Sequence, residues 1–204
     1  TDIATDGSLT LRTQAEVDAF ARSGINTVEG NLTIGGEDEE NPVTNLDGLK
    51  NLVSVRCDLT ITAAYTGETL AGLENLTTCE SLRIGSTAHP NETLRQLSLP
   101  ALKEIKGDLC VYGTALQTAD FKSLQSVAGH FVLQSDALLQ LTADELTTVA
   151  GNMTLIGTTA DEAKAPCEQM YFPKLQRIDG TLTLSRFDRL SGLGTTFGVL
   201  TQAG

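Results

Sequence analysis

Tryptophan is absent from this 204-residue chain, and aromatic residues account for only 4% of it. The core must therefore be built from aliphatic side chains, which the 40% apolar content can supply. Histidine occurs twice and no Cys-x-x-Cys pair is present, so we expect neither a zinc site nor any other metal or cofactor. No apolar run approaches the roughly 18 residues of a membrane span, and the chain is not expected to cross a membrane.

Positive charge is scarce as well, since 14 Lys and Arg residues stand against 26 Asp and Glu residues, for a net charge of −12. Nucleic acids and anionic membrane surfaces are bound through clusters of Lys and Arg. We therefore expect neither partner. The acidity is typical of a well-hydrated surface.

One phrase recurs seven times along the chain: an apolar residue, another three positions later, and then a short strand of the type Leu-x-Ile. The expected strands start 22 to 29 residues apart, at Leu32, Leu59, Leu82, Leu109, Phe131, Met153 and Leu182. Such a period is typical of a solenoid, in which each coil buries its apolar face only by stacking on its neighbours. We predict an all-β fold, a right-handed leucine-rich β-helix of about seven coils.

Each coil has further regular features. Alternation along the strands predicts one internal ladder, made of Leu59, Leu109, Phe131, Met153 and Leu182. Glycine stands two positions before the strand in five of the seven coils, at residues 30, 107, 129, 151 and 180. It indicates a corner with either positive φ or too little room for a Cβ. Upstream apolar residues at a period of three, as at 46, 49, 52 and 55, favour a turn-and-strand path.

The register is uninterrupted, so we predict a single domain over residues 1–204, with repeats at 25–189. Residues 1–24 are expected to form an N-terminal cap, because Thr13-x-x-Glu16 has capping-box form ahead of Val17, Phe20 and Ala21 on one helical face. Residues 190–204 are expected to be a C-terminal cap or a linker. The variable loops at 35–45, 62–69, 85–93 and 157–169 follow the strands, and insertions there should share one edge of the solenoid.

The phrase Gly-Leu-x-Asn-Leu-x-x-Val-x-Gly-x-Leu-Thr-Ile can be read from residues 48–55, 72–76 and 30–34. It resembles the receptor L-domain family of leucine-rich β-helix repeats, and residues 9–20 look most like the bacterial cell-surface branch of that family. The family includes ligand-binding modules of growth-factor and insulin-type receptors, so the resemblance implies a binding scaffold rather than a chemistry. The Cys-rich modules that flank the receptor versions are missing here, which argues against growth-factor binding.

Repeat scaffolds are chiefly binding surfaces, and we therefore expect a non-enzymatic adhesion or binding module that recognises a protein or a glycan. The chain starts at Thr1 without a basic and apolar leader, which is consistent with a cytosolic protein or with a removed secretion signal. Repetitive Thr, Gly and Asn favour an extracellular, surface-located protein, anchored as an outer-membrane lipoprotein through the removed segment. The alternative is a carbohydrate-active lyase or hydrolase, which would need clustered carboxylates on an exposed face.

A candidate ligand-binding patch follows from the same alternation, which turns five side chains outward on three consecutive strands: Tyr112, His130, Val132, Gln134 and Ile156. Strands lie about 4.8 Å apart, so these side chains should form one partly apolar surface, as contact sites do. In the alternative, the 157–169 loop buries the patch through Met170 and Tyr171, or through a Cys110–Cys167 disulfide.

Several polar features remain open. Cys57 and Cys79 occupy nearly equivalent turns of neighbouring coils, so a disulfide is sterically possible, although Cys79 also fills an apolar position that suits a buried thiol. Cross-strand ion pairs are expected among Asp58, Arg83 and Asp108. Four Asn-x-Thr sequons begin at residues 31, 75, 91 and 152, either as glycosylation sites or as a product of the repeat.

Overall fold

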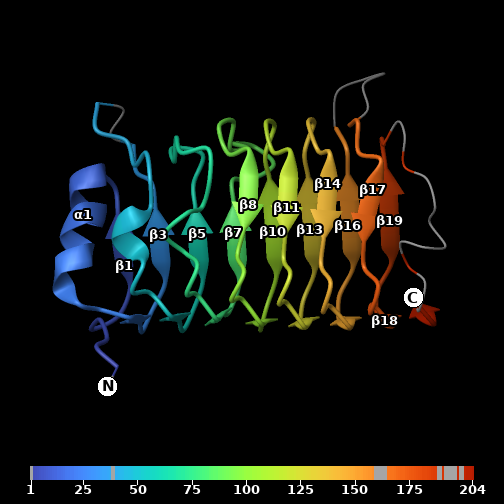
Figure 1. The fold of residues 1–204 in the computed structure, drawn as a ribbon, viewed down its shortest axis with the longest axis horizontal. Helices are drawn as coiled ribbons and strands as arrows, with labels where there is room; N and C mark the ends of the chain where they lie inside the picture. Colours follow the sequence, from blue (N-terminus) through green and yellow to red (C-terminus); the bar gives the residue numbers. More distant parts are fainter. Residues whose placement is uncertain (1, 38–39, 159–164, 188–189, 191–196, 198–199) are drawn as a thin grey trace.

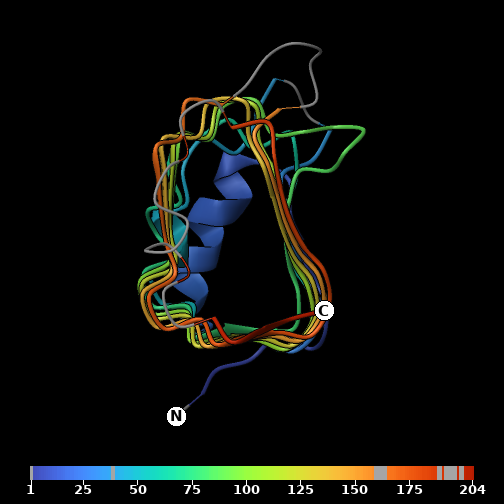
Figure 2. The same cartoon turned by 90° about the vertical axis from the view of Figure 1, so that its right-hand side faces the viewer.

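The computed structural model of the chain describes residues 2–37, 40–158, 165–187, 190, 197 and 200–204. These residues wind into a β-solenoid of three parallel sheets, whose strands follow one another along the long axis (Figure 1). The coils superpose closely when viewed along that axis (Figure 2). The all-β solenoid predicted from the sequence is confirmed.

Two sheets have eight strands and one has four. Sheet A contains β2 (Thr27–Val28), β4 (Ser54–Val55), β6 (Thr78–Cys79), β9 (Glu104–Ile105), β12 (Ser126–Val127), β15 (Thr148–Val149), β18 (Arg177–Ile178) and β20 (Gln202–Ala203). Sheet B contains β1 (Leu9–Leu11), β3 (Leu32–Ile34), β5 (Leu59–Ile61), β7 (Leu82–Ile84), β10 (Leu109–Tyr112), β13 (Phe131–Gln134), β16 (Met153–Ile156) and β19 (Leu182–Ser185). Sheet C contains β8 (Gln96–Ser98), β11 (Thr118–Asp120), β14 (Gln140–Thr142) and β17 (Gln169–Tyr171).

Sheet B contains the strands that the repeat predicted, and all seven start at the expected residue. Leu59 stacks through Leu82 on Leu109, which pairs with Phe131, and the ladder continues through Met153 to Leu182. All members of this ladder are fully buried except Leu182, which is half-buried near the end of the stack. Each fully buried aliphatic side chain contributes about 1.5–3 kcal/mol, so stacking is the main source of stability.

The solenoid has about eight coils, one more than the sequence predicted. Strand β1 pairs in register with β3, so residues 9–11 belong to the first coil rather than to a separate cap. This coil was not counted because Asp2 and Thr5 stand where later coils have their upstream apolar residues, and helix α1 (Gln14–Ser23) follows its strand.

Helix α1 covers the N-terminal end of the solenoid (Figure 1). Thr13 and Glu16 form the predicted capping box, and Gly24 ends the helix in the left-handed conformation. Val17 and Phe20 are buried, whereas Ala21 is exposed and does not share the packed face. Gly48 lies so close to the Val17 carbonyl that a Cβ would overlap it, which shows how tightly the first 3₁₀ turn (Asp47–Leu49) approaches α1.

The apolar period of three arises from consecutive tight turns. The Leu49 N–H donates to the Leu46 carbonyl, and the Leu52 N–H donates to the Leu49 carbonyl, both at 2.9 Å. The same pattern recurs in the next coil at Leu70, Leu73 and Leu76. Each of these tight turns therefore brings one Leu into the core every three residues.

A ladder of side-chain hydrogen bonds runs along the corner between sheets A and B. Its members each precede a strand of sheet B, and each accepts the backbone N–H of the aligned residue in the next coil at 2.8–3.2 Å. We call this the corner ladder; it consists of Ser8, Asn31, Asp58, Ser81, Asp108, His130 and Asn152. Ser, Asn, Asp and His differ in size and charge, but each has a side-chain atom that can accept a hydrogen bond.

The corner ladder explains the repeated glycine. A Cβ at Gly129 would overlap the Asp108 carboxylate of the preceding coil, and a Cβ at Gly151 would overlap the His130 ring. None of the five corner glycines has a positive φ. Of the two reasons considered from the sequence, lack of space is therefore the correct one.

We expect Gly129→Ala to lower the free energy of unfolding by about 1–3 kcal/mol, the usual cost of forcing extra volume into a packed site. Gly113→Ala is the matched control, because its Cβ would lie 3.4 Å from Leu116 and 3.5 Å from the Asn91 carbonyl, in ordinary contact. Urea denaturation of both variants checks this. Equal midpoints for the two would contradict the proposed overlap.

Candidate functional site

The loops that follow the strands of sheet B emerge from one edge of the solenoid (Figures 1 and 2). This edge lies between sheet B and sheet C, because residues 85–93 follow β7 of sheet B and precede β8 of sheet C. Insertions at one point of the repeat thus share one edge, as predicted. Residues 38–39 and 159–164 of these loops lie outside the described part of the chain.

The predicted patch residues lie on neighbouring strands of sheet B. Tyr112 pairs with Gln134, which pairs with Ile156, and Val132 lies in the adjacent outward row. All four side chains are half-buried. Partial burial, with the Cys110 thiol adding to it and Arg83 opposing it, raises the pKa of Tyr112 above its usual value.

His130, the fifth predicted residue, has a structural role in the corner ladder. Its ring Nδ1 accepts the backbone N–H of Asn152 at 2.8 Å, and the backbone N–H of His130 donates to the Asp108 carboxylate at 2.8 Å. The ring nitrogen Nδ1 is therefore occupied as a hydrogen-bond acceptor. The side chain is exposed, so beside this structural role His130 stays a predicted ligand contact.

The proposed covering of the patch by Met170 and Tyr171 is wrong. Met170 is 1% exposed and points into the core from β17, where it pairs with Leu141. Tyr171 lies on the outer face of sheet C beside Thr142. Because sheet C is a separate wall of the solenoid, neither side chain reaches the outer face of sheet B.

The four cysteines are free thiols, so neither proposed disulfide is formed. Cys79 points inward beside Ile105 in sheet A, whereas the Cys57 sulfur lies 3.9 Å from the Glu29 carbonyl at the corner. The two sulfurs thus face different sides of the backbone. Burial, with a contribution from Asp58, raises the pKa of Cys79 to about 12 and keeps it protonated.

The expected ion pairs are formed in part. Arg83 approaches Asp108 at 3.7 Å, with both side chains partly exposed, and such a pair adds little stability. Asp58 instead accepts the Ser81 N–H at 3.2 Å as a member of the corner ladder. The pair Arg83–Asp108 leaves the outer face of sheet B locally neutral beside Tyr112.

A pocket with a volume of about 470 Å³ opens on the same face and was not predicted. Its walls are residues 35–37, Thr60, residues 62–64, Gly85, Ser86 and His89, from β5 and the three loops that follow β3, β5 and β7. Small side chains create the space, and they leave no motif in the sequence. The only available signal was the run of Gly and Thr at the positions that Tyr112, Gln134 and Ile156 occupy in later coils.

Pocket and patch are contiguous along the solenoid axis. Gly85 directly follows Ile84, which pairs with Val111, so Gly85 lies beside Tyr112. A Cβ at Gly85 would come within 2.5 Å of the Tyr112 carbonyl oxygen. The face therefore changes from a recess over β5 and the loops that follow β3, β5 and β7 to larger side chains at the ends of β10, β13 and β16.

Hydroxyl groups in the pocket retain a proton to donate. Thr62 Oγ1 accepts the Ala64 N–H at 3.2 Å, and Ser86 Oγ accepts the His89 N–H at 3.0 Å. Each hydroxyl thereby stabilises its own loop while its O–H hydrogen remains available. Thr60 on β5, two residues before Thr62, also lines the pocket.

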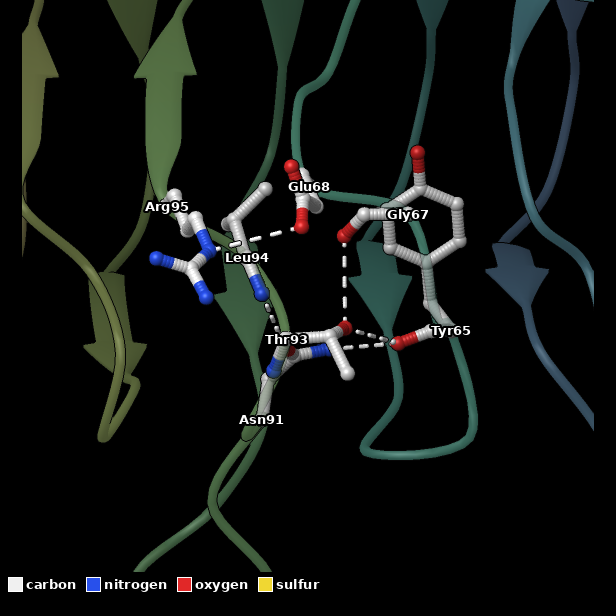
Figure 3. A network of polar contacts seen from close by, with 7 residues as sticks. All are labelled: Tyr65, Gly67, Glu68, Asn91, Thr93, Leu94 and Arg95. Atoms are coloured by element: carbon white, nitrogen blue, oxygen red, sulfur yellow. Dashed lines mark hydrogen bonds and ion pairs between the residues drawn. The ribbon is translucent and has the colours of Figure 1, made fainter.

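Two of the three loops that line the pocket, 62–69 and 85–93, are connected by Asn91, as Figure 3 shows. Asn91 is fully buried, and its amide donates to the carbonyls of Thr62 and Tyr65 at 3.2 and 3.0 Å. Its carbonyl oxygen accepts the N–H groups of Thr93 and Leu94 at 3.1 and 2.8 Å. All its hydrogen-bonding capacity is used, so the pocket walls are fixed relative to each other.

Neighbouring groups reinforce this connection. The Thr93 hydroxyl is a shared donor to the backbone carbonyls of Tyr65 and Gly67. Arg95 forms an ion pair with Glu68 at 3.4 Å. The Tyr65 hydroxyl donates to the Thr69 carbonyl at 2.6 Å. Burial, with Asp47 adding to it, raises the pKa of Tyr65 to about 12, so this donor keeps its proton.

Comparisons with family models, with curated proteins and with solved structures found no match for this chain. The helices among the described residues are too short or too polar to cross a membrane. No group of three or more His, Cys, Asp or Glu side chains suited to a metal ion occurs in the described ranges.

Proposed function

We propose that this chain is a non-enzymatic binding module of receptor L-domain type, located at the cell surface as an outer-membrane lipoprotein, that recognises a protein or a glycan. One observation carries the proposal: the pocket of about 470 Å³ and the Tyr112–Gln134–Ile156 row form one continuous face bordered by variable loops. Loops held on a rigid scaffold are common recognition sites. The Asn91 connection supports this role, because a preorganised site loses less entropy on binding.

The double substitution Tyr112→Ser and Ile156→Ser is expected to weaken partner binding while the melting temperature stays nearly constant. Both side chains are half-buried on the outer face, so little core packing is lost. Binding is measured by glycan array and by pull-down from a surface extract. Tyr171→Ser on the outer face of sheet C serves as the control, and it should bind like the wild type.

A large fall in melting temperature for the double variant would mean that these side chains act as core. Unchanged binding with unchanged stability would place the recognition site elsewhere. Either result contradicts the proposed face.

A second function, carbohydrate cleavage, is favoured by one observation on sheet C. Partial burial and the nearby Asp144 raise the pKa of Asp120, with Lys122 opposing them, and a raised carboxyl pKa is a feature of the general acid in glycoside hydrolysis. If the wild type releases reducing ends from polysaccharides and the Asp120→Asn variant does not, the result would support an enzyme. Binding without turnover would favour the module.

A further inference from the structure

We infer that the pocket and the adjacent Tyr112 bind a neutral oligosaccharide whose chain lies along the solenoid axis. This inference rests on the proposed function and specifies its ligand. It combines the charge of the pocket lining, the available hydrogen-bond donors, the position of the tyrosine ring and the spacing of the coils.

The charge of the lining selects against ionic ligands. Among the described lining residues, Glu37 and His89 are the titratable ones, and the rest are Gly, Ala, Ser and Thr. The Glu37 carboxylate in a chain of net charge −12 repels anions, and the described lining contains no second carboxylate that would help to bind a cation. A polar ligand without net charge matches this lining best.

The hydrogen-bonding groups suit sugar hydroxyls. Thr60, Thr62 and Ser86 present O–H groups that can donate to and accept from a ligand, while the methyl groups of Ala63 and Ala64 suit the apolar faces of a sugar ring. An apolar side chain from a protein partner would leave these hydroxyls without partners, which costs free energy when they are buried. The lining thus favours a glycan over a protein.

Tyr112 and Gln134 extend the site along the axis. Tyr112 lies one strand beyond Gly85 at the edge of the pocket, and its half-buried ring can pack against the C–H face of a sugar. Gln134 pairs with Tyr112 one strand further and offers an amide. Strands are about 4.8 Å apart, close to the length of one sugar ring, so successive rings would meet successive coils.

The test uses the full chain and a panel of short neutral gluco-, manno-, galacto- and xylo-oligosaccharides, with uronic-acid oligosaccharides for comparison. Titration calorimetry and saturation-transfer NMR are expected to show binding of at least one neutral series and weaker binding of the acidic ones. Tyr112→Ala should lower the affinity about tenfold or more, and Tyr112→Phe should lower it little, because the ring face makes the contact.

A matched pair of substitutions isolates the pocket from general effects on the sheet. Thr60→Val should lower the affinity about three- to tenfold by removing one hydroxyl, whereas Thr183→Val, the same change at the equivalent outward position of β19, should not. Both are conservative strand substitutions, so they also test the site if Tyr112→Ala proves unstable.

Three outcomes would overturn the inference: no binding of any neutral oligosaccharide, equal or tighter binding of the acidic series, or full affinity in both Thr60→Val and Tyr112→Ala. If a protein from a surface extract binds the wild type but not Thr60→Val, and no sugar binds, the ligand class is wrong while the proposed binding function stands. If neither protein nor sugar depends on this face, both are wrong.

Discussion

The Leu109→Asp variant is expected to lose most of its folding free energy, about 5 kcal/mol or more. Leu109 is fully buried and stacks between Leu82 and Phe131 in the middle of sheet B. The substitution removes a leucine side chain from the core and places an unpaired carboxylate there, which is among the most costly of single changes. Domains are commonly stable by only about 5–15 kcal/mol.

The repeat architecture spreads this effect to neighbouring coils. Each coil of a solenoid gains its stability from the interfaces with the coils on either side. A disrupted coil at Leu109 therefore removes support from the aromatic contacts that follow it, where Phe131 packs edge-on against Phe121 and Phe172 at centroid distances of 5.9 and 6.3 Å. We expect a broad, early unfolding transition.

Thermal denaturation followed by circular dichroism measures the effect. Leu139→Asp is the matched control, because the same carboxylate then replaces a leucine that is 47% exposed. The control should melt close to the wild type. An unchanged melting temperature for Leu109→Asp would refute the inward register of sheet B.

The strands of sheet B could be predicted because two inward residues per strand repeat in a fixed phrase. Sheet C was not predicted as a sheet, since each of its strands contributes a single inward residue, such as Ala119 or Leu141, and so shows no alternation. The first coil was missed for a related reason, because Asp2 and Thr5 stand where later coils have their upstream apolar residues. Periodicity thus reveals sheet B, in which inward side chains repeat along each strand. It misses sheet C, in which each strand has only one inward side chain.

The candidate site was predicted in part for physical reasons as well. Tyr112 and Ile156 were placed on the outer face because alternation fixes their direction. The pocket beside them arises from the absence of large side chains at Gly35, Thr62 and Gly85, and an absence has no periodic signal. The role of His130 depends on the ring nitrogen that accepts a hydrogen bond. Ser, Asn and Asp provide an acceptor at the equivalent positions of other coils, and these residue types form no recognisable sequence pattern.

The second large effect is expected at Asn91, whose side chain joins the loops around the pocket (Figure 3). Asn91→Asp keeps the size of the side chain and the oxygen that accepts from Thr93 and Leu94. It replaces the donor that faces the Thr62 and Tyr65 carbonyls with a charged oxygen. We expect a loss of about 3–5 kcal/mol at neutral pH, because a buried charge then faces two carbonyl oxygens.

Asn75→Asp provides the matched control, since Asn75 is exposed and donates one bond, at 2.7 Å, to the Lys50 carbonyl. Both residues begin Asn-x-Thr sequons, but the full burial of Asn91 means that the folded protein does not present its amide for glycosylation. The control should lose no more than about 1 kcal/mol.

The defect of Asn91→Asp should depend on pH in a defined direction. Burial raises the pKa of the introduced carboxyl group in the folded state above its value in the unfolded state. The folded variant therefore binds the proton more tightly, so its stability relative to the wild type rises as the pH falls toward the ordinary carboxyl range and is lost as the pH increases. Urea denaturation of the wild type and both variants at several pH values measures this, and proteolysis of the 85–93 loop reports whether the pocket wall has opened. A pH-independent difference, or a defect no larger than that of Asn75→Asp, would show that the Asn91 amide does not hold the two loops together.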